Sequence, residues 1–147
     1  MPQLQLVEKT AYQPAAPEIT DAEGEAMARA VVNLFAKWGI IDAQAAILLG
    51  GLSPRTWARW KVGDIGRISR DLKSRLSNLM GIHKALRIIF TDADRVYGWV
   101  KRPNEAFGET PALNVMLGGE LTDIMRVRRY LDNVSCLLYT SPSPQDA

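Results

Sequence analysis

Residues 48–63 read LLGGLSPRTWARWKVG, and this stretch decides the fold that the sequence predicts. Trp57 and Trp60 are three positions apart in it, Arg55 precedes both of them, and Arg59 stands between them. At about 100° per residue of α-helix, the two arginines lie within about 40° of each other, and the two tryptophans lie on the opposite side. We therefore expect the tryptophans to face the core and the arginines to face solvent.

The residues around the tryptophans mark the ends of two short helices. Gly50 and Gly51 end a helix over 43–49, which Asp42 can cap. Ser53 is a favourable cap for the following helix, and Pro54 suits its first turn. Two short helices joined by a tight glycine turn are typical of a helix-turn-helix, whose second helix can enter the DNA major groove. An ordinary helical hairpin with solvated arginines is the alternative.

Charge supports contact with DNA at this place. The net charge of the chain is only +2, but residues 53–75 hold seven basic and two acidic residues, a local excess of five. Arginine can bind guanine edges in the major groove, and lysine or serine can bind phosphates. The candidate DNA-contacting residues are Ser53, Arg55, Thr56, Arg59, Lys61 and Arg67.

The rest of the chain predicts an all-α protein, since apolar residues recur at helical spacing and no stretch shows sustained strand alternation. We expect further helices over 21–38, 69–90, 92–101, 112–117 and 120–133. The predicted organisation is a flexible arm over 1–20, a helix-turn-helix region over 21–68, a central helix over 69–90, a small helical region over 91–134 and a tail over 135–147. The tail reads SCLLYTSPSPQDA, and we expect it to be disordered or foreign to the native protein.

The central helix carries a seam of apolar residues in steps of four and three, as in a coiled coil. This seam either forms the core under the other helices or meets a second copy of the chain. The candidate dimerisation residues are Leu72, Leu76, Leu79, His83 and Leu86. A histidine in such a seam suggests that assembly weakens at mildly acid pH, because charging a buried imidazole is costly.

The sequence argues against an enzyme. A single histidine, His83, and a single cysteine, Cys136, exclude a disulfide framework and argue against a zinc site. No glycine-rich phosphate loop or nucleophile elbow is present, so we expect no catalytic residue, no metal and no cofactor. The N-terminus does not read as a signal peptide, and no apolar run approaches the roughly 18 residues of a membrane span. We expect a cytoplasmic protein.

Two longer stretches carry a resemblance to a known family. AAILLGGLSPRTWARWKVG, followed by WVKRPNEAFGETPALNVMLGGELTDIMRVRRYLD, resembles the Xre/MbcA/ParS family of antitoxins over roughly residues 31–133. In that family a helix-turn-helix region precedes a C-terminal toxin-binding region. The second half of the resemblance is the more specific, in Trp99, Pro103-Asn104, Phe107-Gly108, Pro111-Ala112-Leu113, Met116-Leu117, Gly119, Val127-Arg128 and Tyr130-Leu131-Asp132.

The resemblance implies a small DNA-binding antitoxin whose partner is a RES-domain toxin, which attacks NAD or uses it to ADP-ribosylate a target. The antitoxin would cover the NAD site of the toxin, and the complex would repress its own promoter. A palindromic operator would favour a homodimer. A free-standing helix-turn-helix regulator without a toxin is the alternative.

The loop RPNEAFGETP is the candidate toxin contact. Pro103 and Pro111 bracket an aromatic residue, Phe107, which either anchors a partner or folds back over the Trp99 helix as core. The candidate toxin-binding residues are Arg102, Pro103, Asn104, Glu105, Phe107, Gly108, Arg128 and Asp132.

Overall fold

The computed structural model describes residues 18–140, and within them the chain is all-α, as the sequence predicts. The α-helices are α2 (Asp21–Trp38), α3 (Asp42–Leu48), α4 (Pro54–Lys61), α5 (Arg70–Ile89), α6 (Ala93–Gly98), α7 (Ala112–Met116) and α8 (Leu121–Thr140). A strand pair that the sequence analysis missed follows the single-turn 3₁₀ helix η1 (Trp99–Lys101), and a second single-turn 3₁₀ helix, η2 (Glu105–Phe107), connects its two strands. Strands β1 (Pro103–Asn104) and β2 (Thr110–Pro111) are antiparallel, with Pro103 opposite Pro111.

Side-chain caps explain where the longer helices begin. The Thr20 hydroxyl accepts a hydrogen bond from the Glu23 amide at 3.1 Å, and the Glu23 carboxylate accepts one from the Thr20 amide at 2.9 Å, which together start α2. At α4 and α5 only the cap hydroxyl takes part: Ser53 accepts from the Thr56 amide and Ser69 from the Leu72 amide. The expected cap of α3 by Asp42 is wrong: Ile41 precedes that helix, and its amide donates to the Gln44 side chain. The Asp42 carboxylate instead accepts hydrogen bonds from Trp57 and Lys61 of α4.

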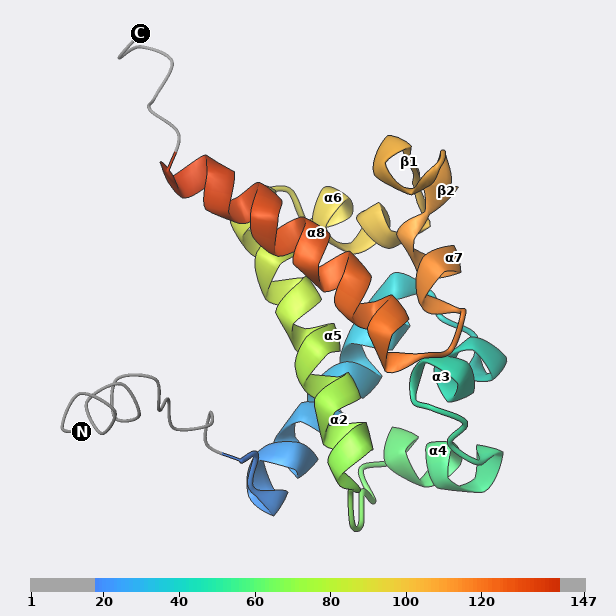
Figure 1. Cartoon of the computed structure of the whole chain (residues 1–147). Helices are drawn as coiled ribbons and strands as arrows, with labels where there is room; N and C mark the ends of the chain where they lie inside the picture. The colour runs from blue at the N-terminus through green and yellow to red at the C-terminus, as the bar shows by residue number, and fades with distance from the viewer. Residues whose placement is uncertain (1–17, 141–147) are drawn as a thin grey trace, which may run out of the picture.

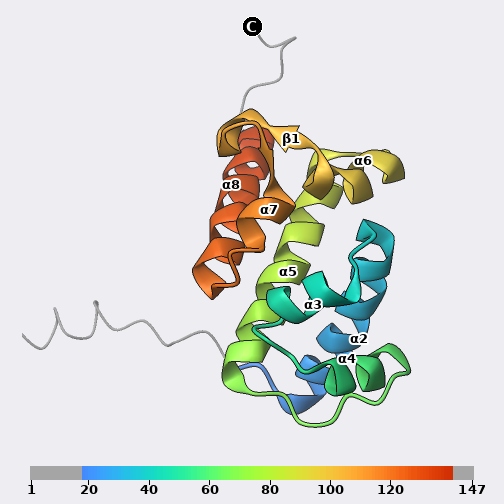
Figure 2. The ribbon, with the colours of Figure 1, turned by 90° about the vertical axis from the view of Figure 1, so that its right-hand side faces the viewer.

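The helices pack around α5. Helix α8 runs along one side of α5, α2 crosses its other side, and α3 and α4 lie together beside the first half of α5 (Figures 1 and 2). The short elements between α5 and α8 lie beside α8, and α7 packs against it. One continuous core results, whose largest fully buried side chains come from α2, α3, α4, α5, α7 and α8, so the two ends of the chain share one apolar interior.

The predicted dimerisation seam is core. Leu72, Leu76, Leu79 and Leu86 are 0–8% exposed, and α2 and α8 cover them from two sides. His83 is partly buried in the same helix. Of the two roles that their spacing allows, these leucines form core in the described chain, and a second copy could reach them only after the helices of the same chain had left; their role in dimerisation stays a prediction. The coiled-coil spacing arose because α5 packs between two long helices of its own chain.

The C-terminal boundary also differs from the prediction. Helix α8 continues to Thr140, seven residues beyond the expected end at 133, so residues 135–140 are helical rather than disordered. Ser135 is buried, and its hydroxyl donates to the Asp132 carbonyl at 3.0 Å. Residues 141–147, and residues 1–17 of the expected N-terminal arm, lie outside the described residues. Over 18–140, no helix combines the length and the apolar character of a membrane span.

Candidate functional site

Helix α4 is amphipathic in the sense that the sequence predicts. Trp57 and Trp60 are 5% and 2% exposed. Their rings lie 6.5 Å apart, and the Trp57 ring lies 5.9 Å from Phe35 of α2. The Trp57 indole donates to the Asp42 carboxylate at 2.8 Å, which ties α4 to the start of α3. These contacts fix the angle at which α4 presents its other face.

The opposite face of α4 is exposed along its whole length. Arg55, Ala58, Arg59 and Val62 are all exposed, and their spacing of three and four residues places them in one stripe. We call these four residues the α4 stripe. Ser53 and Thr56 lie at its edge, where they bond each other: the Ser53 hydroxyl accepts from the Thr56 amide and donates to the Thr56 hydroxyl. Those two hydroxyls are therefore engaged in starting the helix.

The cations of α4 differ in how firmly they are held. The Arg59 guanidinium pairs with Asp64 at 3.0 Å, and Lys61 pairs with Asp42 at 3.0 Å, whereas Arg55 makes no ion pair within residues 18–140. Hydrogen bonds from Trp57 and then Lys61 lower the pKa of Asp42. Exposed pairs of this kind are weak, so DNA phosphates or bases can compete for the arginine. Lys61 lies at the side of the helix and fastens α4 to α3.

The turn between α3 and α4 depends on a buried arginine that the sequence analysis missed. Gly50 and Gly51 have φ values of +80° and +89°, a region that favours glycine. The Arg75 guanidinium, 7% exposed, lies against Gly50, so that a Cβ there would come within 2.8 Å of it. Arg75 donates to the Leu48 carbonyl at 3.3 Å and to Asp71 at 3.0 Å. A charge from α5 thus caps the end of α3 and positions the turn.

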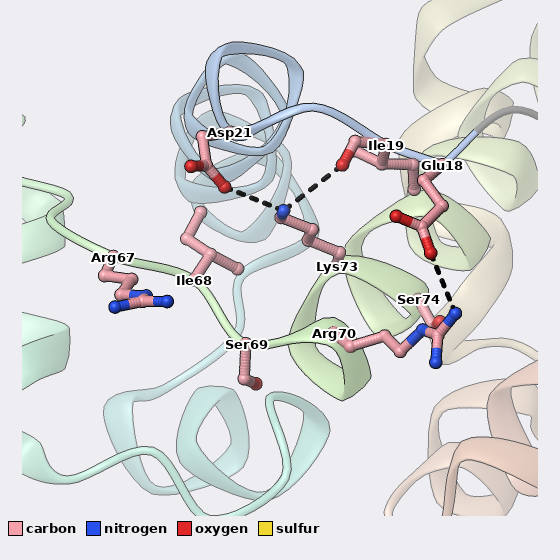
Figure 3. Close-up of a pocket in the computed structure, with 9 residues that line it drawn as sticks. All are labelled: Glu18, Ile19, Asp21, Arg67, Ile68, Ser69, Arg70, Lys73 and Ser74. Atoms are coloured by element: carbon pink, nitrogen blue, oxygen red, sulfur yellow. Dashed lines mark hydrogen bonds and ion pairs between the residues drawn. The ribbon is translucent and has the colours of Figure 1, made fainter.

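Basic residues continue from α4 into the start of α5 and line an open hollow of about 520 Å³. Figure 3 shows Lys73 turned toward Asp21 and the Ile19 carbonyl, and Arg70 paired with Glu18 at 3.0 Å. The hydrogen bond from Lys73 also lowers the pKa of Asp21. No interaction is drawn to Arg67 among the residues of this view. Acidic residues at the start of α2 therefore neutralise part of the basic block, and the charge of Arg67 also contributes to the lowered pKa of Asp21.

The loop between Pro103 and Pro111 is a folded hairpin over an aromatic cluster. The Phe107 ring lies 5.3 Å from Tyr130 and 6.4 Å from Trp99, both edge-on, and Trp99 stacks on Tyr130 at 6.3 Å. Phe107 is only 8% exposed, and the Arg126 guanidinium covers its ring at 5.4 Å. Of the two readings of Phe107, the structure shows the core residue. The ring holds the hairpin on α8, and the assignment of Phe107 as a toxin anchor stays a prediction.

Polar and conformational features shape the tip of this hairpin. The Asn104 side chain accepts from the Ala106 amide at 2.8 Å and starts η2. Gly108 and Glu109 both have positive φ, +66° and +64°. Glu109 has a conformation that non-glycine residues rarely adopt, and such strain gathers at functional sites. The exposed predicted residues here are Arg102, Pro103, Glu105 and Gly108.

Two family models match the chain at these two places. Residues 17–81 match the antitoxin Xre-like helix-turn-helix domain, and residues 85–135 match the antitoxin Xre/MbcA/ParS C-terminal toxin-binding domain. The chain is also similar to the uncharacterized protein y4oB of Sinorhizobium fredii (strain NBRC 101917 / NGR234), with 36% identity over 118 residues that cover 80% of this chain and 91% of that protein.

The chain belongs to the Xre/MbcA/ParS antitoxin family. It carries the helix-turn-helix and the toxin-binding domain of an antitoxin of a toxin–antitoxin system, and so the family resemblance of the sequence is confirmed. The two matches meet at residues 82–84, within α5, so one helix belongs to both domains.

Two of the predicted toxin-binding residues of this antitoxin lie apart from the hairpin. Arg128 and Asp132 pair along α8 at 3.4 Å, and Arg128 also donates to Asn78 of α5 at 3.3 Å. Arg126 and Tyr130, which touch Phe107, stand two positions away, which on a helix is the opposite side. The predicted set is therefore divided between two faces of α8. Arg128 packs over Gly81, where a Cβ would clash with its guanidinium, so it joins α8 to α5.

His83 lies where the two matched domains of the antitoxin meet. Its ring stacks on Tyr97 of α6 at 5.5 Å, and Lys37 of α2 lies 5.2 Å from the centre of the same tyrosine ring. Its Nδ1 is buried without a hydrogen-bond partner in the described part of the chain. Burial, and then the charge of Arg87, lower the pKa of His83. The surroundings of His83, which come from three helices of one chain, thus favour the neutral imidazole.

Proposed function

We propose that this antitoxin binds operator DNA through α4 and represses its own promoter. The observation that carries the proposal is the α4 stripe, which presents Arg55 and Arg59 outward while Trp57 and Trp60 are buried beneath it. A short helix held this rigidly can place guanidinium groups at guanine edges, and Arg67 and Lys61 lie beside it for phosphate contacts. Binding through phosphates makes affinity fall steeply with salt.

The test of DNA binding is the double variant Arg55→Ala/Arg59→Ala. Fluorescence anisotropy with a duplex from the antitoxin's own promoter should show a loss of specific affinity of about 30-fold or more, since each arginine–guanine pair contributes about 1–3 kcal/mol. Arg129→Ala removes an exposed arginine of α8 and is the matched control, which should bind as the parent does. Equal binding by the double variant and the parent would contradict the proposal.

We further propose that the partner is a RES-domain toxin that consumes NAD or uses it to ADP-ribosylate a target, and that the antitoxin covers its NAD site. The toxin-binding domain over 85–135 and the family resemblance support a toxin partner. The hairpin is the contact that the geometry favours, because Arg102, Pro103 and Glu105 are exposed on a support fixed by Phe107. No step of neutralisation requires catalysis by the antitoxin, since covering the cleft is sufficient.

Co-expression with the toxin encoded beside the antitoxin tests this contact. The charge-reversed variant Arg102→Glu/Glu105→Arg keeps the net charge and changes only exposed side chains, and it should fail to rescue growth. The Arg55→Ala/Arg59→Ala variant should rescue growth as the parent does. Truncation after Phe90 is a poor test, because removing α8 uncovers the apolar face of α5. Rescue by the charge-reversed variant would place the toxin contact elsewhere.

Homodimerisation remains part of the proposal, on a surface other than the α5 leucines. A two-fold dimer would present two copies of α4 to the two halves of a palindromic operator. Sedimentation at micromolar concentration, with and without operator duplex, measures it. A monomer in both conditions would restrict the antitoxin to single sites or to assembly through the toxin.

A further inference from the structure

An apolar side chain stands at the end of α4 without a role in the fold. Val62 is the C-cap residue of α4 and is 82% exposed, more than any other large hydrophobic residue that the structure describes as exposed. Scattered single apolar residues are ordinary on a protein surface, so exposure alone has no meaning here. What distinguishes Val62 from such residues is its position in the α4 stripe.

The backbone holds Val62 firmly in that stripe. Its φ and ψ are −99° and 10°, and its amide donates to the Arg59 carbonyl at 3.2 Å. The Gly63 amide donates to Trp60 and the Asp64 amide to Arg59, both at 2.9 Å, so the chain turns sharply after Val62. Seven residues separate Val62 from Arg55, which is about 10 Å of helix and nearly two full turns. Both side chains therefore point to the same side of α4.

The α4 stripe carries cationic and apolar groups, and the major groove of DNA presents matching partners for both. Its guanidinium groups suit the acceptor atoms of guanine, and its apolar groups, Val62 and Ala58, suit the C5 methyl of thymine. The surface around it is cationic, with Arg67 and Arg70 on the following segment and the Arg59 guanidinium beside Gly66. Such a setting favours a nucleic acid, because every phosphate of the DNA backbone carries a negative charge that cationic side chains can neutralise.

We propose that Val62 is a specificity-determining residue that contacts the C5 methyl group of a thymine in the operator, near the guanine bound by Arg55 or Arg59. The inference rests on the proposed entry of α4 into the major groove. In this proposal the C-terminal end of α4 also contacts a base. The arginines alone would predict the recognition of guanine only. The expected operator then contains a guanine and a thymine on the same face of the groove, separated by about one helical turn of α4 if Arg59 binds the guanine and by about two turns if Arg55 does.

The experiment begins with duplexes enriched by the full-length protein from a random DNA library. In the best duplex, each thymine is replaced in turn by deoxyuracil, which removes only the C5 methyl group. At one position in each half-site, this replacement should weaken binding by the parent about fourfold, as expected for one apolar group of that size. Val62→Ser should bind the two duplexes equally, and Val62→Ile should keep the preference.

The matched control is Ile41→Ser, which removes an exposed apolar residue, 62% exposed, from just before α3 and should keep the preference for thymine. If no deoxyuracil replacement weakens the parent, or if Val62→Ser keeps the preference, the proposal is overturned. If Val62→Ser instead dissociates a dimer, Val62 belongs to a protein interface. If the parent enriches no sequence at all, the proposed DNA recognition by α4 fails, which is a different result.

Discussion

The α4 stripe and the hairpin over 103–111 are both surfaces built on buried aromatic rings, but they differ in how the rings are divided between core and surface. Under α4, Trp57 and Trp60 lie wholly inside, and the outward face carries other residues. Under the hairpin, Phe107 is buried, while Trp99 and Tyr130 stack on each other and remain partly exposed. The residues that support the α4 stripe are therefore different from those that form its surface. In the hairpin, some of the supporting rings are themselves part of the surface.

The difference follows from the backbone. A helix repeats every 3.6 residues, so it can assign every aromatic residue to one face and every cation to the other. The hairpin has two-residue strands and one turn of 3₁₀ helix, with no period that separates two faces. Changes on the stripe are thus expected to alter DNA binding without loss of folding, whereas changes in the hairpin are expected to alter toxin binding and local stability together.

The largest effect is expected from the support of α4. Trp60→Ala removes a side chain that is 2% exposed and leaves a cavity between α4 and the core, at a cost of about 3–5 kcal/mol in the free energy of unfolding. Urea denaturation measures this loss. DNA binding should disappear together with stability at 37 °C, and Trp60→Phe should restore most of both. Unchanged stability would show that the ring is not core.

Phe107→Ala tests whether the hairpin differs as described. The ring is at the margin of the core, and so the expected cost is smaller, about 3 kcal/mol or less. Because α4 is distant along the chain and its contacts are separate, DNA affinity measured below the unfolding transition should equal that of the parent, while toxin binding is lost. A loss of toxin binding without any loss of stability would indicate that Phe107 contacts the toxin directly.

Arg75→Met tests the buried charge behind the helix-turn-helix. The Leu48 carbonyl and Asp71 lose their partner, and the free energy of unfolding should fall by about 1–3 kcal/mol. Hydrogen exchange should show the loss concentrated in α3 and the turn after it. Arg87→Met, an exposed arginine at the other end of α5, is the control and should leave exchange in α3 unchanged.

Asp64→Asn should strengthen DNA binding. The carboxylate pairs with Arg59 at an exposed position, where such pairs contribute about 1 kcal/mol or less, and it also repels phosphates. Anisotropy at low salt should show a gain of up to about fivefold, which disappears in the Arg59→Ala background. A gain that persists without Arg59 would mean that Asp64 acts on the DNA directly.

The smallest effect concerns His83 and pH. Its pKa is lowered in the folded protein, with Tyr97 and Lys37 on the facing helices and Arg87 on its own. At a pH well above about 6.5 the imidazole is neutral in both the folded and the unfolded state. As the pH falls below that value the unfolded state binds the proton first, so the free energy of unfolding decreases. His83→Gln should lack this part of the decrease when urea denaturation is compared at about pH 7.5 and pH 5.5.

The sequence predicted the surfaces whose residues are close along the chain. The cap Ser53, the glycine turn and the two faces of α4 are local features, and the structure has them as expected. The family pattern also located the toxin-binding domain. The cap of α3 was assigned wrongly because Asp42 has a stronger use in the bond from Trp57, fifteen residues away. Arg75 was missed for a similar reason, since its partner carbonyl is 27 residues distant.

By itself, the sequence determined that this protein is helical, where its helices begin, and which face of α4 is apolar, because hydrogen bonding within a helix and its 3.6-residue period depend on neighbours in the chain. Only the tertiary structure decided what covers each apolar face. In the structure, the leucines of α5 pack against α2 and α8 of the same chain, and the Phe107 ring packs against Tyr130. Apolar burial is non-directional, so spacing shows that a face is buried but cannot name what buries it.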